Sequence, residues 1–278
     1  MSKERSDPMS FKDLEHSGWQ AKAKGFDNSV GTVTAQALDA AMDAAAISPG
    51  RDVLDVACGP GYGVAGAEAR GATAIGIDFA DSMIELASSS YPSFYFRVGD
   101  GENLQFDDES FDSVICLFGL LHMPDPEKAI VEAYRVLRPQ GRYAFTVWET
   151  AETHEFFSLV TSAIDEYGDK NISLPPAPSM FRFSDPGECV RTLVGSGFQE
   201  VKVQSLPLLW KGRSGADCLD LIYSGTVRIA MLLEQQPGKA LEKIHDAVIE
   251  GAERFRRNEL IELAWPATLA SATKPNRN

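Results

Sequence analysis

Apolar and polar positions alternate along the first 150 residues in a pattern that predicts strands and helices in turn. Short apolar runs that end at a glycine or an acid predict buried strands, and apolar residues spaced three or four apart predict helices. The predicted strands are 53–56, 74–77, 94–98, 111–117 and 142–148, and the predicted helices lie near 33–45 and 61–70 and begin at 81 and 126. This alternation is typical of an α/β fold whose parallel sheet carries helices on both faces.

After residue 150 the pattern becomes less regular. A helix at about 151–166 and a Pro-rich loop at 170–180 precede a helix that begins at Asp185 and a strand at 198–204. Two long helical patterns follow, at about 215–234 and 238–257, and the first is apolar on most sides. We therefore expect the first of these two helices to be buried.

A glycine-rich turn follows the first predicted strand. The strand carries Asp55, and the chain then reaches Gly59 and Gly61 before the next helix begins. Glycine permits positive φ and lets a ligand approach the backbone, while the helix offers its unpaired N–H groups. Asp78 ends the second strand, about 20 residues beyond the turn, where an acid can take a ribose hydroxyl pair. Asp100 ends the third, so three acids are expected at one edge of the sheet.

The same stretch contains a literal G-x-G-x-x-G at 61–66, so a nicotinamide-dependent oxidoreductase is an alternative. In a dinucleotide site the first glycine follows the strand almost at once. Here Gly61 comes five residues after Val56, and Asp55 would repel a pyrophosphate. The register therefore favours a cationic ligand over a dinucleotide.

Five blocks in order resemble the class I S-adenosylmethionine-dependent methyltransferases, most closely the small-molecule branch (methyltransferase type 11) with the ubiquinone and menaquinone C-methyltransferases. The blocks are 53–61, 76–83, 99–104, 116–123 and 135–141. The resemblance implies a Rossmann-like, seven-stranded, mostly parallel sheet with a last antiparallel strand near 264–273. The helices at 215–257 would then be an insertion that caps the acceptor pocket. Ala57 and Gln140 depart from the pattern, because each stands where the family usually has glycine.

The resemblance also implies a set of site residues. S-adenosylmethionine would be held, with S-adenosylhomocysteine as its product, by residues at the strand ends: Asp55, Ala57, Gly59, Gly61, Asp78, Phe79, Met83, Asp100, Gly101, Glu102 and Leu117. The acceptor pocket would be formed by Trp19, Phe26, Tyr62, Phe118 and His122. His122 is the candidate catalytic base or acceptor-orienting group, with a structural hydrogen bond as the alternative. Packing within the main domain is the alternative for the aromatic residues and for Met83.

The expected organisation has six parts. They are N-terminal lid helices at 1–47, the S-adenosylmethionine-binding core at 48–150, a helical and Pro-rich insertion at 151–182, a core continuation at 183–211, a helical cap at 212–258, and a final strand and tail at 259–278. Residues 1–14 are polar, and we expect them to be loose.

The amino-acid composition limits which kinds of binding partner are expected. The 278 residues include 26 Lys and Arg against 40 Asp and Glu, a formal net charge of −14, which disfavours nucleic acid as a partner. No run approaches the ~20 apolar residues needed to span a bilayer, so we expect no membrane insertion. Four scattered cysteines and no metal-ligand spacing argue against disulfides and metal and favour a cytoplasmic protein.

These observations predict a methyltransferase that acts on a small aromatic or apolar acceptor at O, C or N. A second alternative is a methyltransferase-fold protein that binds the cofactor without transferring methyl, because a fold does not fix a function. The acceptor and the oligomeric state, a homodimer included, stay open.

Overall fold

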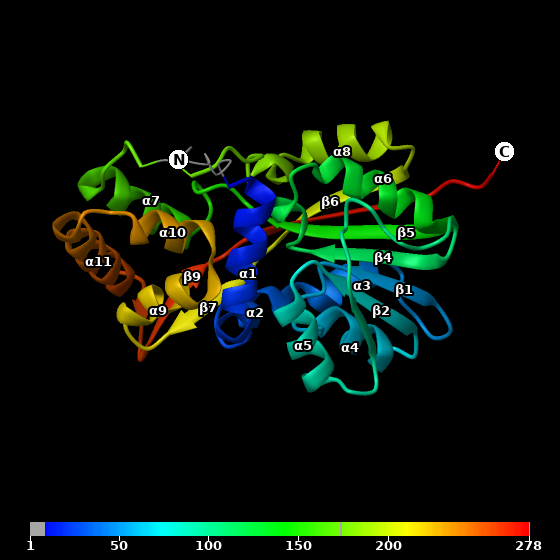
Figure 1. The fold of residues 1–278 in the computed structure, drawn as a ribbon, viewed down its shortest axis with the longest axis horizontal. Helices are drawn as coiled ribbons and strands as arrows, with labels where there is room; N and C mark the ends of the chain where they lie inside the picture. The colour runs from blue at the N-terminus through cyan, green and yellow to red at the C-terminus, as the bar shows by residue number, and fades with distance from the viewer. Residues whose placement is uncertain (1–8, 173, 278) are drawn as a thin grey trace, which may run out of the picture.

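Seven strands form the central sheet of the computed structural model, which describes residues 9–172 and 174–277 (Figure 1). Their bounds are β1 (Asp52–Val56), β2 (Thr73–Asp78), β3 (Tyr95–Val98), β4 (Phe111–Leu117), β5 (Leu137–Trp148), β6 (Gln199–Leu206) and β10 (Ala267–Thr273). The strand order is β3-β2-β1-β4-β5-β10-β6. The first five strands run parallel, and β10 pairs antiparallel with both β5 and β6. The predicted Rossmann-like fold with one antiparallel strand is confirmed.

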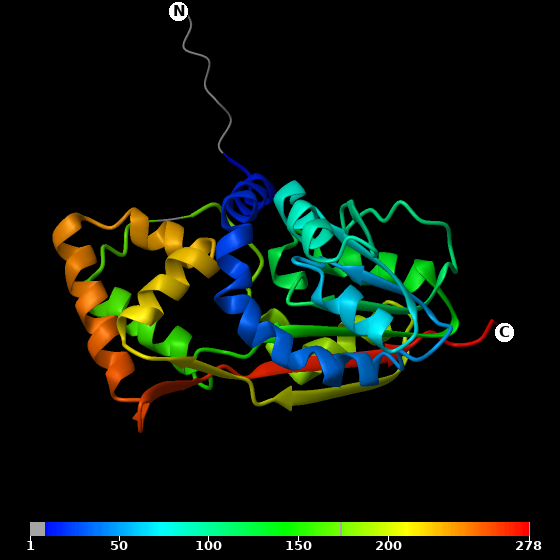
Figure 2. The same cartoon turned by 90° about the horizontal axis from the view of Figure 1, so that it is seen from below.

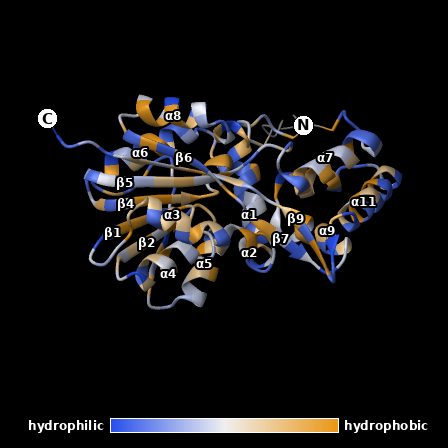
Figure 3. Ribbon diagram, turned by 180° about the vertical axis from the view of Figure 1, so that it is seen from behind, coloured by the Kyte–Doolittle hydropathy of each residue, from blue (hydrophilic) through white to orange (hydrophobic). Residues whose placement is uncertain are grey.

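Helices cover both faces of this sheet. One face packs α6 (Pro126–Val136) and α8 (Pro186–Gly195), whereas the other packs α3 (Leu38–Ala44) and α4 (Tyr62–Ala69), with α5 (Asp81–Ser90) beside β2 and β3 (Figure 1). Because both faces are covered, the central strands are apolar along most of their length (Figure 3). The carboxyl ends of the strands stay free of these helices and meet the rest of the chain.

A second group of elements gathers at that end (Figure 2). It contains α7 (Glu155–Tyr167), α9 (Ala216–Gly225), α10 (Arg228–Glu234), α11 (Gly238–Glu253), and a small antiparallel sheet of β7 (Leu209–Gly212), β9 (Leu260–Ala264) and β8 (Arg256–Arg257). Three helices occupy most of the expected helical cap at 212–258, but Gly212 ends β7 and Arg256–Arg257 form β8. The last strand begins at 267 rather than near 264. The alternation of buried and half-buried residues in β9 has the period of two that marks a strand.

The expected helix at 215–234 is interrupted. Thr226 is extended, with φ −123° and ψ 147°, and separates α9 from α10. A Cβ on Gly225 would come within 2.4 Å of Ser29 Oγ, so glycine allows a close approach to the N-terminal helices. The break places residues 226–229 against the open end of the central sheet.

The N-terminal region forms α1 (Phe11–Asp27), α2 (Val30–Thr34) and the 3-10 turn η1 (Ala35–Ala37) before α3. Helix α1 begins at Phe11, so the expected loose segment ends earlier than residue 14; residues 1–8 lie outside the described part. Ser10 caps the helix by accepting a hydrogen bond from the backbone N–H of Asp13 at 3.2 Å. Helix α1 lies between the central sheet and the second group of elements (Figure 2).

Within the described residues, no helix combines the length and the apolar character required to cross a bilayer.

Candidate functional site

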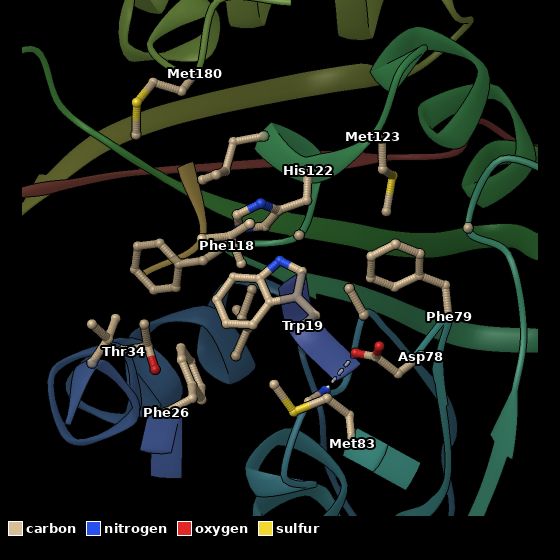
Figure 4. Close-up of a pocket in the computed structure, with 18 of the residues that line it drawn as sticks. Trp19, Phe26, Thr34, Asp78, Phe79, Met83, Phe118, His122, Met123 and Met180 are labelled. Atoms are coloured by element: carbon tan, nitrogen blue, oxygen red, sulfur yellow. Dashed lines mark hydrogen bonds between the residues drawn. The ribbon is translucent and has the colours of Figure 1, made fainter. Parts of the chain in front are cut away.

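The carboxyl ends of the central strands open into a cavity of about 360 Å³. Of the residues that the sequence assigns to the cofactor or the acceptor, every one except Gly61 lines it: Trp19, Phe26, Asp55, Ala57, Gly59, Tyr62, Asp78, Phe79, Met83, Asp100, Gly101, Glu102, Leu117, Phe118 and His122. Figure 4 shows how several of these side chains converge from separate elements. The cavity has an acidic half at β1–β3 and an aromatic half under the second group of elements.

The glycine-rich turn forms one wall of the acidic half. Ala57, Gly59 and Gly61 all have positive φ, at 58°, 49° and 93°. An alanine in the left-handed region costs about 1–2 kcal/mol, so the turn tolerates strain at the position where the family usually has glycine. Gly61 faces away from the cavity, and a Cβ there would come 2.8 Å from Phe96 Cζ, which makes its role one of packing at the start of α4.

Asp78 holds this turn in place. Its carboxylate accepts hydrogen bonds from the backbone N–H of Gly59 at 3.0 Å and of Ala80 at 2.9 Å. The side chain therefore connects the end of β2 to the turn after β1. Asp78 thus organises the turn itself, in addition to the ribose contact that the sequence suggests.

Two buried acids dominate the electrostatics. Asp55 is 2% exposed and Asp78 is 6% exposed. Burial, reinforced by repulsion from Asp78, raises the pKa of the Asp55 carboxyl to about 8. Burial also raises the pKa of Asp78, although the two N–H donors partly offset it. A Cβ on Gly63 would lie 2.2 Å from Asp55 Oδ2, so the helix approaches this carboxylate as closely as glycine permits.

The third strand end contributes Asp100 and Glu102. Lys12 from helix α1 reaches both, with its Nζ 2.6 Å from Asp100 Oδ2 and 3.2 Å from Glu102 Oε2. Burial raises the pKa of Asp100, but Lys12 and the N–H of Glu102 outweigh it and lower the pKa below its ordinary value. Sequence reasoning did not single out Lys12, because an isolated lysine near the N-terminus has no motif around it.

The other half of the cavity is aromatic. The ring centroids of Phe118 and Trp148 lie 4.0 Å apart, and those of Trp19 and Phe26 lie 5.4 Å apart at a right-angled arrangement. Tyr62 lines the junction between the halves and donates its hydroxyl proton to the Asp27 carboxylate at the end of α1. Planar, apolar walls favour a planar, apolar guest.

Sequence reasoning missed most of this half. The missed lining residues come from the lid, the ends of β4 and β5, the second group of elements and the loop before α8, and include Phe11, Val30, Thr34, Leu38, Leu121, Met123, Trp148, Phe156, Phe157, Met180, Val227, Arg228, Ile229 and Trp265. Trp148 ends the fifth parallel strand, so the strand-end rule that identified Asp55 could have found it. The others depend on the docking of distant segments.

His122 lies in the turn η2 (Leu120–His122) after β4 and packs edge-on against the Trp19 indole, with centroids 4.9 Å apart. Its Nδ1 is 2.8 Å from Glu15 Oε2, and that same oxygen accepts from Trp19 Nε1 at 3.1 Å. Glu15 is completely buried. No sequence motif indicates an acid beside His122, because Glu15 sits in a helix whose other charged residues face outward or reach the rim.

No group of three or more His, Cys, Asp or Glu residues in the described ranges could hold a metal ion. The four cysteines, all of them described, are free and buried. Burial raises the pKa of the Cys116 thiol to about 12, which makes it a poor nucleophile.

We compared the sequence and the fold of this chain with those of known proteins, and both comparisons find similar proteins. A methyltransferase domain family matches residues 54–145. The chain is 30% identical over 178 residues to the ubiquinone/menaquinone biosynthesis C-methyltransferase UbiE of Geotalea daltonii, covering 58% of this chain and 76% of that protein. It is 28% identical over 174 residues to the demethylmenaquinone methyltransferase of Renibacterium salmoninarum, covering 59% and 73%. The solved structure of the YcgJ protein from Bacillus subtilis shares the fold, with a TM-score of 0.58 at 21% identity over 87% of this chain and 99% of that one.

Proposed function

Since this chain belongs to the class I S-adenosylmethionine-dependent methyltransferases, we propose that it methylates a small aromatic or apolar acceptor bound in the aromatic half of the cavity. The observation that carries this proposal is the cavity itself, which joins acids at three strand ends to an aromatic chamber. The acceptor atom stays open among O, C and N.

The chain's residues fit the cofactor. Burial and the nearby Asp78 raise the pKa of the Asp55 carboxyl, so its charged form would be favoured by a cationic ligand group such as an ammonium or a sulfonium. We assign the ribose diol to Asp78 and the adenine ring to the apolar surface of Phe79, Met83 and Leu117, all of which line the cavity. The oxidoreductase alternative loses its motif, because residues 62–66 lie inside helix α4.

The relatives support an aromatic acceptor. Their names refer to menaquinone and ubiquinone biosynthesis. In this chain the Phe118 ring packs against the Trp148 ring, and the ring centroids of Phe156 and Trp265 lie 4.5 Å apart in the same wall of the cavity. Such walls exclude water and orient a flat ring. Proximity and orientation of the reactants can lower the activation barrier by about 7–11 kcal/mol, and a methyl transfer obtains most of its acceleration in this way.

S-adenosylmethionine supplies an electrophilic methyl group on a sulfonium that leaves as a neutral thioether. The protein's tasks are to align the acceptor and, for a hydroxyl or enol, to take its proton. We assign the second task to His122, which borders both halves of the cavity.

The first experiment is a thermal-shift series with S-adenosylmethionine, S-adenosylhomocysteine, NAD and NADP. A ligand at about 100 times its dissociation constant stabilises the fold by roughly 2.7 kcal/mol, a shift of several degrees. We expect a shift with the first two ligands only. A shift with NAD or NADP instead would overturn the cofactor assignment.

The second experiment follows S-adenosylhomocysteine release with phenols, hydroquinones and arylamines of one to two rings. We expect turnover with at least one class, and a loss of about 10²-fold or more in kcat for His122→Ala with unchanged cofactor affinity. His245→Ala is the matched control, because His245 bonds to Tyr223 away from the cavity. Absence of product across the panel would favour the alternative in which the fold binds the cofactor without transferring methyl.

A further inference from the structure

Helix α1 brings a buried carboxylate to the candidate base. Glu15 is 0% exposed, and its Oε2 lies 2.8 Å from His122 Nδ1. The same oxygen accepts the Nε1–H of Trp19 at 3.1 Å, which fixes the carboxylate in place. The two residues are 107 positions apart in sequence, so only the docking of α1 onto the end of β4 creates the pair.

Only one of the two carboxylate oxygens of Glu15 takes part in these contacts. Glu15 Oε1 is buried and has no hydrogen-bond partner among the described residues. A buried carboxylate oxygen without a partner destabilises the fold, and such groups concentrate at functional sites.

The Glu15–His122 pair determines which nitrogen of the His122 imidazole carries the proton. A carboxylate accepts hydrogen bonds and donates none, so the neutral ring beside Glu15 must carry its proton on Nδ1. Nε2 is then the bare nitrogen, and the ring lines the cavity beside Trp19 and Phe118 (Figure 4). In serine proteases, a buried carboxylate likewise selects the tautomer that leaves the other nitrogen free to take a proton.

We propose that Glu15 is a positioning residue that holds His122 in the Nδ1–H tautomer, with Nε2 aimed at the acceptor. This rests on the proposed function for its consequence in catalysis, although the tautomer itself does not. The pair also links the base to the lid. Lys12, Glu15 and Trp19 follow one another at three and four residues, so one face of α1 touches the acids of β3, the base and the acceptor chamber.

The tautomer can be measured without an acceptor. We would record ¹⁵N–¹H side-chain correlation spectra of the histidines, with S-adenosylhomocysteine present and absent, at a pH where the rings are neutral. His122→Asn assigns the His122 signals. We expect wild-type His122 to be protonated on Nδ1, and Glu15→Gln to raise the share of the Nε2–H form, because an amide is a weaker acceptor than a carboxylate. A wild-type ring protonated on Nε2, or one unchanged by Glu15→Gln, would overturn the proposal.

Kinetics separate positioning from folding. With an acceptor identified in the phenol and hydroquinone panel, Glu15→Gln should lower kcat at least about 10-fold while calorimetric affinity for S-adenosylhomocysteine stays within about twofold. Asp13→Asn, on the same helix and exposed, removes the same charge and should leave kcat and the His122 spectrum unchanged. If kcat is unchanged in Glu15→Gln while His122→Ala is impaired, the positioning role is wrong. If no acceptor reacts, the proposed function fails, and the wild-type spectrum still tests the tautomer.

Discussion

The raised pKa of Asp55 makes a quantitative prediction about cofactor binding. With a pKa of about 8, this carboxyl is about 90% protonated at pH 7 in the unliganded protein. A cationic group in the acidic half of the cavity favours the charged form and drives the proton off. Binding at pH 7 should therefore release about 0.9 proton, and the affinity contribution of Asp55 should grow about 50-fold between pH 6 and pH 8.

The affinity is expected to rise with pH because burial raises the pKa of Asp55. Below pH 8 the free protein carries the proton and must lose it on binding, so affinity rises with pH. The cofactor's own amino group opposes this rise at any pH at which it loses its charge. Asp55→Asn is nearly isosteric and does not titrate, so subtraction of its pH profile isolates the contribution of Asp55.

The assay is isothermal titration calorimetry with S-adenosylhomocysteine at pH 6, 7 and 8, repeated at pH 7 in phosphate and Tris. The difference in binding enthalpy between the buffers reports the protons released. We expect wild type to release about 0.9 proton more than Asp55→Asn, with circular dichroism confirming that both are folded. Equal release by both proteins, or a flat ratio of their affinities across this range, would refute the role of Asp55 as counter-charge.

Three further predictions concern single residues. Asp78→Ala should weaken S-adenosylhomocysteine binding at least about tenfold, because it removes both the proposed ribose contact and the acceptor that holds the turn; unchanged calorimetric affinity would contradict this. Gly63→Ala should lower the unfolding free energy by about 1–3 kcal/mol and weaken S-adenosylhomocysteine binding, because its Cβ would lie 2.2 Å from Asp55 Oδ2. Gly195→Ala is the control: it has open space around it, and it should change neither the melting curve nor the calorimetric titration. Burial lowers the pKa of His154 to about 3, so between pH 7 and pH 5 this residue takes up a proton in the unfolded chain but not in the folded protein. The unfolding free energy of wild type should therefore fall by about 2 kcal/mol over this range. His154→Asn should lose that dependence in urea unfolding, and an unchanged slope would assign it to other groups.

The acidic half of the cavity could be predicted because its information is local. Each acid follows an apolar run, and a parallel sheet brings the carboxyl ends of such runs to one edge. The order of strands and helices along the chain is therefore enough to place Asp55, Asp78 and Asp100 together. Ala57 and Gln140 both adopt left-handed φ, at 58° and 65°, which explains why glycine is usual in the family at these positions.

The aromatic half could not be predicted because it depends on segments far apart in the chain. Trp265 follows β9, and β9 was missed since its partner β7 lies about 50 residues earlier and both strands are short. Glu15 was missed for a related reason, because an acid on an N-terminal helix is ordinarily exposed. One local signal was available: Ser10 followed three residues later by Asp13 resembles a capping box and marks the start of α1.

The packing of α1, more than its surface charges, brings Glu15 to His122. The Lys12–Asp100 pair joins partly exposed side chains, 42% and 39% exposed, and such a pair contributes only about 0–1 kcal/mol. Leu14 and Trp19 are buried, and full burial of a large apolar side chain is worth about 1.5–3 kcal/mol. The indole of Trp19 also packs on His122 and holds Glu15 through Nε1. The apolar contacts that hold α1 against the rest of the protein therefore also hold Glu15 against His122. A substitution that loosens this packing should weaken both the docking of α1 and the contact between Glu15 and His122.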